Sequence, residues 1–260
     1  MNLSSEEILH YEARGYLVRH SVFSKDEITG LRHAIERAET NARHLSATGK
    51  TYFLDGKRFV DSQGSTLQYE HEAQSEDLRV IEPIHIFDTE IDALLDDPRL
   101  VQPMQTIIGC RDLSLWTGKL NLKPGGGSGF GWHQDSPYWI HDCQHVDQLP
   151  NVMVTLDDQD ESNGCFRVIA GSHKQGILPG HNNGTQLGGF FTDPSAFNMA
   201  DQVAMKVPAG SLVFFNPHIV HGSAPNMSTL PRRALIFTYQ PGNQPLLKTG
   251  EVRNIANTIT

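Results

Sequence analysis

The chain has 260 residues, of which 38% are hydrophobic and 20% are charged, and these values are typical of a globular protein rather than a disordered one. Its formal net charge is −9, which argues against a nucleic-acid partner or an anionic membrane, because both repel an acidic surface. A β-barrel or sandwich of this length commonly forms one domain, so we expect a single domain over residues 1–260.

The first part of the chain predicts helices. A serine followed by acidic residues, at 4–7 and again at 24–27, is typical of a helix start. The apolar stripe of the second helix fails from about Asn41. Residues 42–78 then mix small, polar and charged residues with few apolar runs, and we interpret them as a mobile loop or lid. Helical periodicity returns between 91 and 108.

From residue 111 onward the pattern changes to short apolar segments separated by glycine and proline. The expected strands are 113–122, 132–135, 151–156, 165–169, 202–206, 211–215 and 234–239. A polar, glycine- and asparagine-rich insertion covers 174–200. The order predicts a helical N-terminal part, about 1–110, that supports a β core over about 111–240. The fold class is therefore mainly β with flanking helices, arranged as a sandwich or barrel.

The three cysteines, at positions 110, 143 and 165, form no Cys-x-x-Cys pair, so neither a disulfide framework nor a thiolate zinc site is indicated. The first residues lack a basic region followed by an apolar run, and we find no apolar segment long enough to span a bilayer. We therefore expect a cytoplasmic protein without a membrane partner. The sequence predicts no oligomeric state.

A histidine and an aspartate stand two positions apart in one expected strand. On a strand, residues i and i+2 point to the same face, so His133 and Asp135 should project side by side. They make two thirds of the two-histidine, one-carboxylate site that binds ferrous iron and leaves coordination positions open. For the third ligand, His218 and His221 both follow the apolar strand 211–215, and spacing alone does not choose between them.

Two arginines enter the last expected strand from the loop before it. Whatever the register of that strand, either Arg232 or Arg233 faces inward. An inward arginine needs an anion, and its rigid fork suits a carboxylate bound through two hydrogen bonds.

Together these motifs resemble the phytanoyl-CoA dioxygenase superfamily of iron(II)- and 2-oxoglutarate-dependent oxygenases. The matching features are Trp-His-Gln-Asp at 132–135, Asn-Gly-x-x-x-x-Ile-x-Gly-Ser-His at 163–173, His-Gly-Ser at 221–223, and an arginine at 232. The resemblance covers about residues 11–239. It implies a double-stranded β-helix, or jelly roll, with flanking helices.

The resemblance implies three iron ligands, which are His133, Asp135 and His221. It implies that Arg232 holds the distal carboxylate of the co-substrate 2-oxoglutarate, helped by the Ser223 hydroxyl, and Asn121 matches an asparagine that contacts the co-substrate in ectoine-hydroxylase-like members. The implied reaction consumes O2, releases succinate and carbon dioxide, and hydroxylates or otherwise oxidises a small molecule. A carboxylate at position 135 argues against halogenation, because halogenating relatives carry a small residue there.

Three further residues are expected to contact the substrate. Trp139 follows the iron-binding motif closely, and Lys119 and Thr117 share a strand face with Asn121. A buried lysine there needs a negative partner. The substrate should be a secondary metabolite or an amino-acid-like compound. Its identity should depend on three variable segments, which are residues 42–78, 136–150 and 174–200.

Other readings of the same residues remain open. The motif after Asp135 differs from that of ectoine hydroxylases, and we see no strongly basic cluster for a coenzyme A tail, so ectoine and acyl-CoA substrates are disfavoured. A non-catalytic jelly roll that binds a small ligand is one alternative function. A zinc hydrolase with the same three ligands is another, but it leaves Arg232 without a role.

Overall fold

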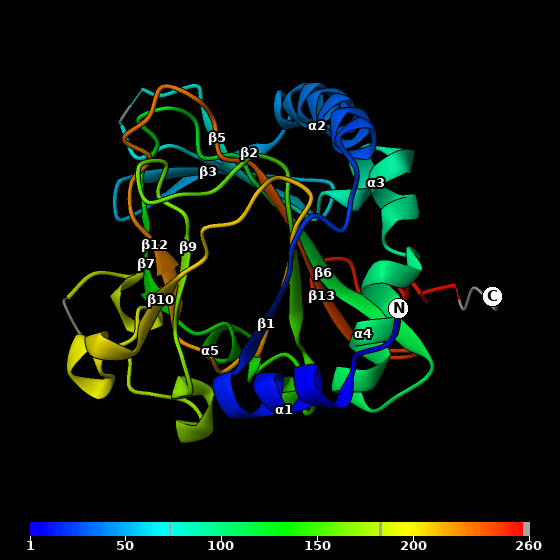
Figure 1. Cartoon of the computed structure of the whole chain (residues 1–260). Coiled ribbons are helices and arrows are strands. Elements are labelled where there is room, and N and C mark those ends of the chain that lie inside the picture. Colours follow the sequence, from blue (N-terminus) through cyan, green and yellow to red (C-terminus); the bar gives the residue numbers. More distant parts are fainter. Residues whose placement is uncertain (73, 182–183, 257–260) are drawn as a thin grey trace.

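The structure, a computed structural model, describes residues 1–72, 74–181 and 184–256. Within these residues two antiparallel sheets face each other, and helices cover the outer face of the larger sheet (Figure 1). This arrangement confirms the predicted class, mainly β with flanking helices.

Sheet neighbours come from distant parts of the sequence. In the described part of the chain, the nine strands of the larger sheet lie in the order β1 (Tyr16–Arg19), β11 (Leu212–Phe215), β8 (Asn151–Thr155), β13 (Ala234–Pro241), β6 (Leu113–Asn121), β5 (Leu78–Glu82), β4 (Ser65–Tyr69), β3 (Lys57–Ser62) and β2 (Lys50–Leu54). The four strands of the smaller sheet lie in the order β10 (Gln202–Ala204), β9 (Phe166–Ile169), β12 (His221–Ser223) and β7 (Phe130–His133).

The α-helices are α1 (Ser5–Arg14), α2 (Lys25–Ser46), α3 (Thr89–Leu94), α4 (Pro98–Ile108) and α5 (Ser136–Trp139). Short 3-10 helices are η1 (His85–Phe87), η2 (Val146–Gln148), η3 (Ser172–Gln175), η4 (Gly188–Phe190), η5 (Pro194–Ala196) and η6 (Met199–Asp201). The first two predicted helix starts are confirmed, because Ser4 and Ser24 cap α1 and α2 with their hydroxyl groups. No helix in the described ranges combines the length and apolar character that crossing a membrane requires.

Side chains of the central strands alternate between two cores. In β11, Leu212 and Phe214 pack under the helices, whereas Val213 and Phe215 pack between the two sheets. The strand reads as a continuous apolar run because both of its faces are buried. The helices therefore shield one face of the larger sheet, and the opposite face is left to build a cavity with the smaller sheet.

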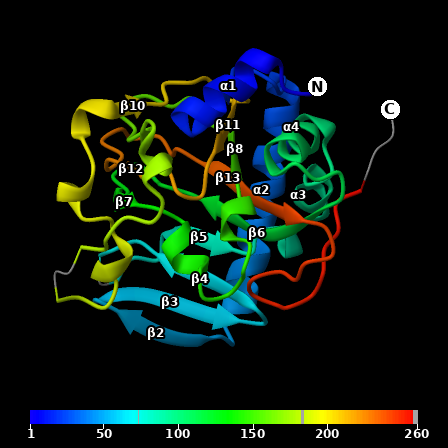
Figure 2. The same cartoon turned by 90° about the horizontal axis from the view of Figure 1, so that it is seen from below.

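The interpretation of residues 42–78 as a mobile loop is wrong. α2 continues to Ser46, and β2, β3, β4 and β5 form a meander that extends the larger sheet (Figure 2). Asp55-Gly56 and Gln63-Gly64 have positive φ at both residues, as in type I′ hairpin turns. The Asp-Gly pair was the sequence signal for a hairpin. A second difference is β12, because the expected strands did not include residues 221–223.

Replacing Leu67 by alanine tests whether this meander is part of the folded core. Leu67 lies on β4 and is fully buried, so its truncation should lower the free energy of unfolding by about 2–5 kcal/mol. Thr51→Ala, on the exposed part of β2, is the control and should change it by about 0.5 kcal/mol or less. Urea unfolding measures both variants. Equally small effects would mean that the segment is not packed.

Candidate active site

Three side chains converge where β7 ends and β12 begins. His133, Asp135 and His221 each offer one ligand atom, and these atoms lie within 4.8 Å of one another. The ring centroids of His133 and His221 are 4.2 Å apart, and His221 Nε2 lies 3.8 Å from Asp135 Oδ2. Two imidazoles and one carboxylate in this arrangement fit the facial site that binds iron(II) and leaves further positions open.

Strand pairing selects the second histidine of this cluster. β12 runs antiparallel to β7, and His221 lies directly opposite His133. His218 is held elsewhere, because its Nδ1 lies 2.8 Å from the Ser136 hydroxyl and its Nε2 lies 2.6 Å from Asp147 Oδ1. The structure therefore separates the two candidates that spacing alone left open, and it agrees with the His221 that the resemblance implied.

Asp135 reaches the cluster by a route that the sequence did not predict. β7 ends at His133, and Asp135 has a helical backbone conformation (φ −79°, ψ −34°) before α5, so the expectation that one strand face carries both ligands is wrong. Its N–H donates to Pro217 O at 3.1 Å, and Asn151 Nδ2 donates to its Oδ2 at 2.9 Å. Burial acts to raise the pKa of Asp135, but nearby basic groups and the Asn151 bond outweigh it and lower the pKa.

Hydrogen bonds set the tautomers of both histidines. His133 Nδ1 lies 2.7 Å from Gly131 O, and His221 Nδ1 lies 3.0 Å from Ile219 O. A carbonyl oxygen only accepts, so each Nδ1 carries the hydrogen and each Nε2 presents a lone pair to the cluster. Burial, followed by repulsion from His221, lowers the pKa of His133 to about 3, and burial lowers the pKa of His221. Both rings are therefore neutral at pH 7, as metal binding requires.

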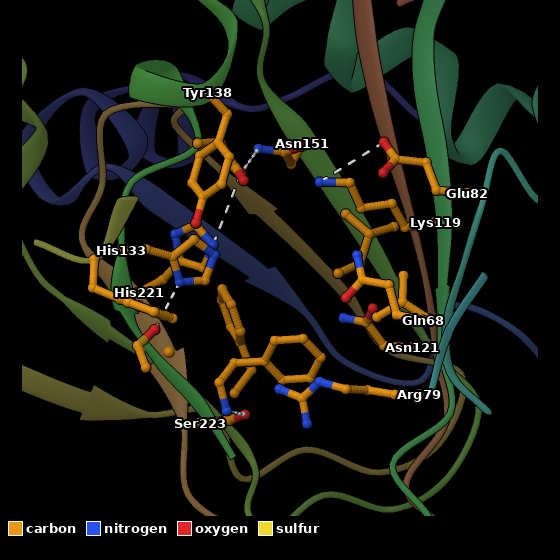
Figure 3. A pocket seen from close by; sticks show the side chains of 18 of the residues that line it. Gln68, Arg79, Glu82, Lys119, Asn121, His133, Tyr138, Asn151, His221 and Ser223 are labelled. Carbon is orange, nitrogen blue, oxygen red and sulfur yellow. Dashed lines mark hydrogen bonds and ion pairs between the residues drawn. The ribbon is translucent and has the colours of Figure 1, made fainter. Parts of the chain in front are cut away.

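A cavity of about 640 Å³ lies between the two sheets and contains this cluster. The wall from the smaller sheet carries three labelled residues, which are His133, His221 and Ser223 (Figure 3). The opposite wall, from the larger sheet, carries Glu82, Lys119 and Asn121 (Figure 3). The cavity therefore has one wall that can hold a metal and another that can face a bound molecule.

Arg232 is the inward-facing member of the arginine pair. It is 2% exposed and lines the cavity, where its Nη1 donates to Gln159 Oε1 at 3.2 Å. Its Nε has no hydrogen-bond partner among the described residues, and burial lowers its pKa to about 10. Arg233 instead pairs with Asp157, with 3.0 Å contacts from Nε and Nη2. A buried guanidinium with an unused N–H group is suited to bind an anion.

Sequence reasoning assigned no role to Lys123, which lies beside this arginine. Lys123 is fully buried, and its Nζ donates to Ser223 Oγ at 2.7 Å, to Gly164 O at 3.1 Å and to Ala224 O. Its position after a predicted strand and before a proline gave no sign of this contact. The lysine orients the serine, and its protonated form adds positive charge near Arg232.

The residues predicted as substrate contacts occupy two kinds of position. Lys119 and Trp139 line the cavity, with Lys119 Nζ 4.0 Å from Glu82 Oε1 and 5.4 Å from the Trp139 ring centroid. Glu82 is the negative partner that the sequence required but did not identify. Thr117 is not among the residues that line the cavity, and its hydroxyl donates to Glu82 Oε1 at 2.7 Å. Its expected direct contact with a substrate is therefore replaced by a contact with the glutamate.

Known proteins are similar to this chain over most of its length. The family described as Phytanoyl-CoA dioxygenase (PhyH) matches residues 11–234. The chain is similar to the "Probable alpha-ketoglutarate-dependent hypophosphite dioxygenase" of Stutzerimonas stutzeri, with 27% identity over 95% of this chain and 82% of the relative. It is also similar to the ectoine dioxygenase of Bordetella parapertussis, with 25% identity over 91% of this chain and 75% of the relative.

A solved structure agrees with the predicted fold. EctD from S. alaskensis, in a crystal structure with 2-oxoglutarate and 5-hydroxyectoine, superimposes with a TM-score of 0.72 and 24% identity. The match covers 94% of this chain and 78% of that one. The likeness confirms the double-stranded β-helix, or jelly roll, that the motifs implied.

Proposed function

Because the chain belongs to the phytanoyl-CoA dioxygenase family of iron(II)- and 2-oxoglutarate-dependent oxygenases, we propose that it hydroxylates or otherwise oxidises a small molecule and converts 2-oxoglutarate to succinate and carbon dioxide. The observation that carries the proposal is the cluster of His133, Asp135 and His221 in one cavity with the buried Arg232, whose Nε has no hydrogen-bond partner among the described residues. The cluster suits a metal, and the arginine suits a carboxylate. An oxygenase that uses iron and 2-oxoglutarate needs both sites.

The metal cluster fits iron(II) by the chemistry of its donors. His133 and His221 would bind the ion through Nε2, and Asp135 would bind it through a carboxylate oxygen. Bound iron and 2-oxoglutarate together supply the oxidant from dioxygen. The protein holds the donors still, since the Nδ1 atoms are fixed by backbone carbonyls and Asp135 is fixed by Asn151.

The co-substrate's distal carboxylate is assigned to Arg232 and Ser223. The unused Nε of Arg232 supports this assignment, because a bound carboxylate would satisfy it. Ser223 Oγ already accepts a hydrogen bond from Lys123 Nζ, so the hydroxyl hydrogen is free to be donated to the carboxylate. Asn121 lines the same cavity and offers an amide donor for the co-substrate.

The affinity for 2-oxoglutarate should fall as the pH rises above about 6. Burial, followed by repulsion from Arg232 and Arg79, lowers the pKa of Lys123 to about 6. A bound dianion raises that pKa, so binding takes up a proton at pH values above it. One linked proton can reduce the affinity by about tenfold per pH unit. Calorimetric titration of the iron-loaded protein without oxygen measures the dissociation constant at each pH.

Two variants control this prediction. Lys123→Met should weaken binding and remove the pH dependence, whereas Lys25→Met, exposed on α2, should keep both. Circular dichroism checks that the buried substitution leaves the fold intact. A wild-type affinity that does not change with pH would contradict the linkage, and a pH dependence that persists in Lys123→Met would assign the proton to another group.

For the substrate we infer a secondary metabolite or an amino-acid-like compound. The relatives are named for small molecules, hypophosphite and ectoine, and a cavity of about 640 Å³ accommodates a small molecule beside 2-oxoglutarate. The residues after Asp135 differ from the ectoine-hydroxylase motif, so we expect a compound other than ectoine.

The test is succinate release by iron-loaded protein with 2-oxoglutarate under air. A panel of candidate compounds is screened for those that stimulate release, and the oxidised product is identified by mass spectrometry. We expect activity with iron and none with zinc. Hydrolysis of a compound by zinc-loaded protein without oxygen would support the zinc hydrolase instead. Binding of a compound with no succinate formed under any condition would support a non-catalytic ligand-binding protein.

A further inference from the structure

Lys119 is a cationic group on the cavity wall opposite the metal cluster. Figure 3 shows its side chain directed from β6 into the cavity, across from His133 and His221. Among the described residues its Nζ forms no hydrogen bond, and its nearest ion-pair partner is Glu82, with Oε1 4.0 Å away. The three N–H donors of this ammonium group are therefore available to a ligand.

Glu82 neutralises Lys119 only loosely. A charge-assisted hydrogen bond between ammonium and carboxylate spans about 2.7–2.9 Å, well short of the observed separation. Oε1 of Glu82 instead accepts the Thr117 hydroxyl at 2.7 Å. Asp135 also attracts Lys119, but a bound metal would take up that carboxylate's charge. In the metal-loaded protein, the ammonium group would thus lack a close counter-charge.

A second lysine adds positive charge on the same side. Lys248 lies at the exposed rim of the cavity, and its Nζ donates to the Thr66 hydroxyl at 2.9 Å. Thr66 on β4 lies directly opposite Glu82 on β5, so Lys119 and Lys248 flank one glutamate. The exposed charges at the rim are Lys248, Asp142 and Asp61, whose Oδ1 accepts the Thr66 hydroxyl at 2.6 Å, and water screens all three. Inside the cavity, Lys119 faces the buried Glu82 without a close contact.

The ammonium group of Lys119 lies near an aromatic ring and stays charged. Its Nζ lies 5.4 Å from the ring centroid of Trp139, which is 2% exposed and packs edge-on against Trp116. Burial acts to lower the pKa of Lys119, but attraction by Glu82, and in the metal-free protein also by Asp135, outweighs it and raises the pKa. The cavity therefore presents a positive charge opposite the metal ligands.

We propose that the substrate carries an anionic oxyacid group, a carboxylate or a phosphonate, and that Lys119 binds this group with Lys248 as the second cation. The inference rests on the proposed oxygenase function and names the chemical class of its substrate. Binding of the anion at Lys119 places the rest of a small substrate between the two walls, facing His133 and His221. Loss of the Lys119 charge would then remove the principal contact with the anion.

The experiment uses matched pairs of charged and neutral probes. Iron(II)-loaded protein is saturated with 2-oxoglutarate without oxygen, so that acids do not compete at Arg232, and its visible iron–2-oxoglutarate absorption is recorded. The probes are butyrate with butyramide, and ethylphosphonate with its diethyl ester. We expect the acids to perturb the absorption and, under air, to stimulate succinate release, while the neutral partners do neither. The acid that has the larger effect, butyrate or ethylphosphonate, identifies the type of oxyacid group.

Variants of the lysine then test its role. Lys119→Met should raise the acid concentration needed for half of the effect by about 10- to 100-fold, the worth of one charged hydrogen bond. Lys119→Arg should recover part of this loss because it restores the charge, and Lys25→Met on exposed α2 should behave as wild type. Co-substrate affinity is measured in parallel without any probe.

The outcomes distinguish a failure of the proposed oxygenase function from a failure of the anionic-substrate inference. An absent iron–2-oxoglutarate absorption in the wild-type protein would count against the proposed function itself. With that absorption present, the anionic-substrate inference is overturned if the neutral probes match the acids, if no acid has an effect, or if Lys119→Met leaves the acid response unchanged. It is also overturned if Lys119→Met mainly weakens 2-oxoglutarate binding, because the lysine would then belong to the co-substrate.

Discussion

Replacing Asp135 by alanine should abolish succinate formation and weaken iron(II) binding by about 100-fold or more. Removal of a residue that only supports a metal ligand typically costs about 10- to 100-fold in metal affinity, so loss of a ligand should exceed that range. Asp135 is also the only anionic member of the described cluster, and its charge balances the ion. Iron content after desalting and a titration with iron(II) under nitrogen measure the binding, and succinate is quantified separately.

Two further variants make the Asp135 result specific. Asn151→Ala removes the 2.9 Å bond to Asp135 Oδ2 and should produce an intermediate loss of about 10- to 100-fold in iron affinity. Asp26→Ala, exposed on α2, should bind iron as the wild type does. If Asp135→Ala retained iron and turnover, the metal cluster would be wrongly assigned.

Replacing Arg232 by alanine should spare iron binding and weaken 2-oxoglutarate binding by about 100-fold or more. Truncating one partner of a buried, hydrogen-bonded charge pair costs about 2–5 kcal/mol, and each 1.4 kcal/mol is about tenfold in affinity. Arg232 is 2% exposed and its Nε has no partner in the described part of the chain, so a bound carboxylate would be desolvated against this N–H group. The visible absorption of the iron–2-oxoglutarate complex, titrated without oxygen, gives the dissociation constant.

Arg233→Ala is the matched control for this prediction. Arg233 pairs with Asp157 outside the cavity, so its loss should affect thermal stability without a comparable effect on 2-oxoglutarate binding. The opposite result, with Arg233→Ala losing the co-substrate and Arg232→Ala keeping it, would exchange the roles of the two arginines. Thermal unfolding of both proteins excludes a loss of binding through misfolding.

The elements that were predictable from sequence are those whose signals are local. Capping serines predicted α1 and α2, and apolar runs predicted β6, β8 and β11. The meander from β2 to β5 was missed, because its strands carry polar residues among the apolar ones and were read as loop. The Asp55-Gly56 pair within it is a local sequence signal for a hairpin turn, which the loop prediction did not take into account.

Because the meander was predicted as a loop, the residues that it contributes to the cavity wall were not predicted either. Lys57, Arg79, Lys119 and Lys248 all line it, although they come from β3, β5, β6 and the segment after β13. No basic cluster is visible along the chain, because strand pairing and not sequence proximity gathers these side chains. Expectations about substrate charge drawn from sequence runs alone were therefore incomplete.

Family motifs and local spacing sufficed to name the iron-binding residues, the jelly-roll class and an inward arginine, since short patterns of residue types carry that information. Spacing alone could not choose between His218 and His221, and neither motifs nor spacing could place Asp135 in a turn after β7 or predict the contact of Lys123 with Ser223. Those features depend on which strands lie side by side and on which side chains the closed cavity excludes from water, and both arise only when distant segments pack together.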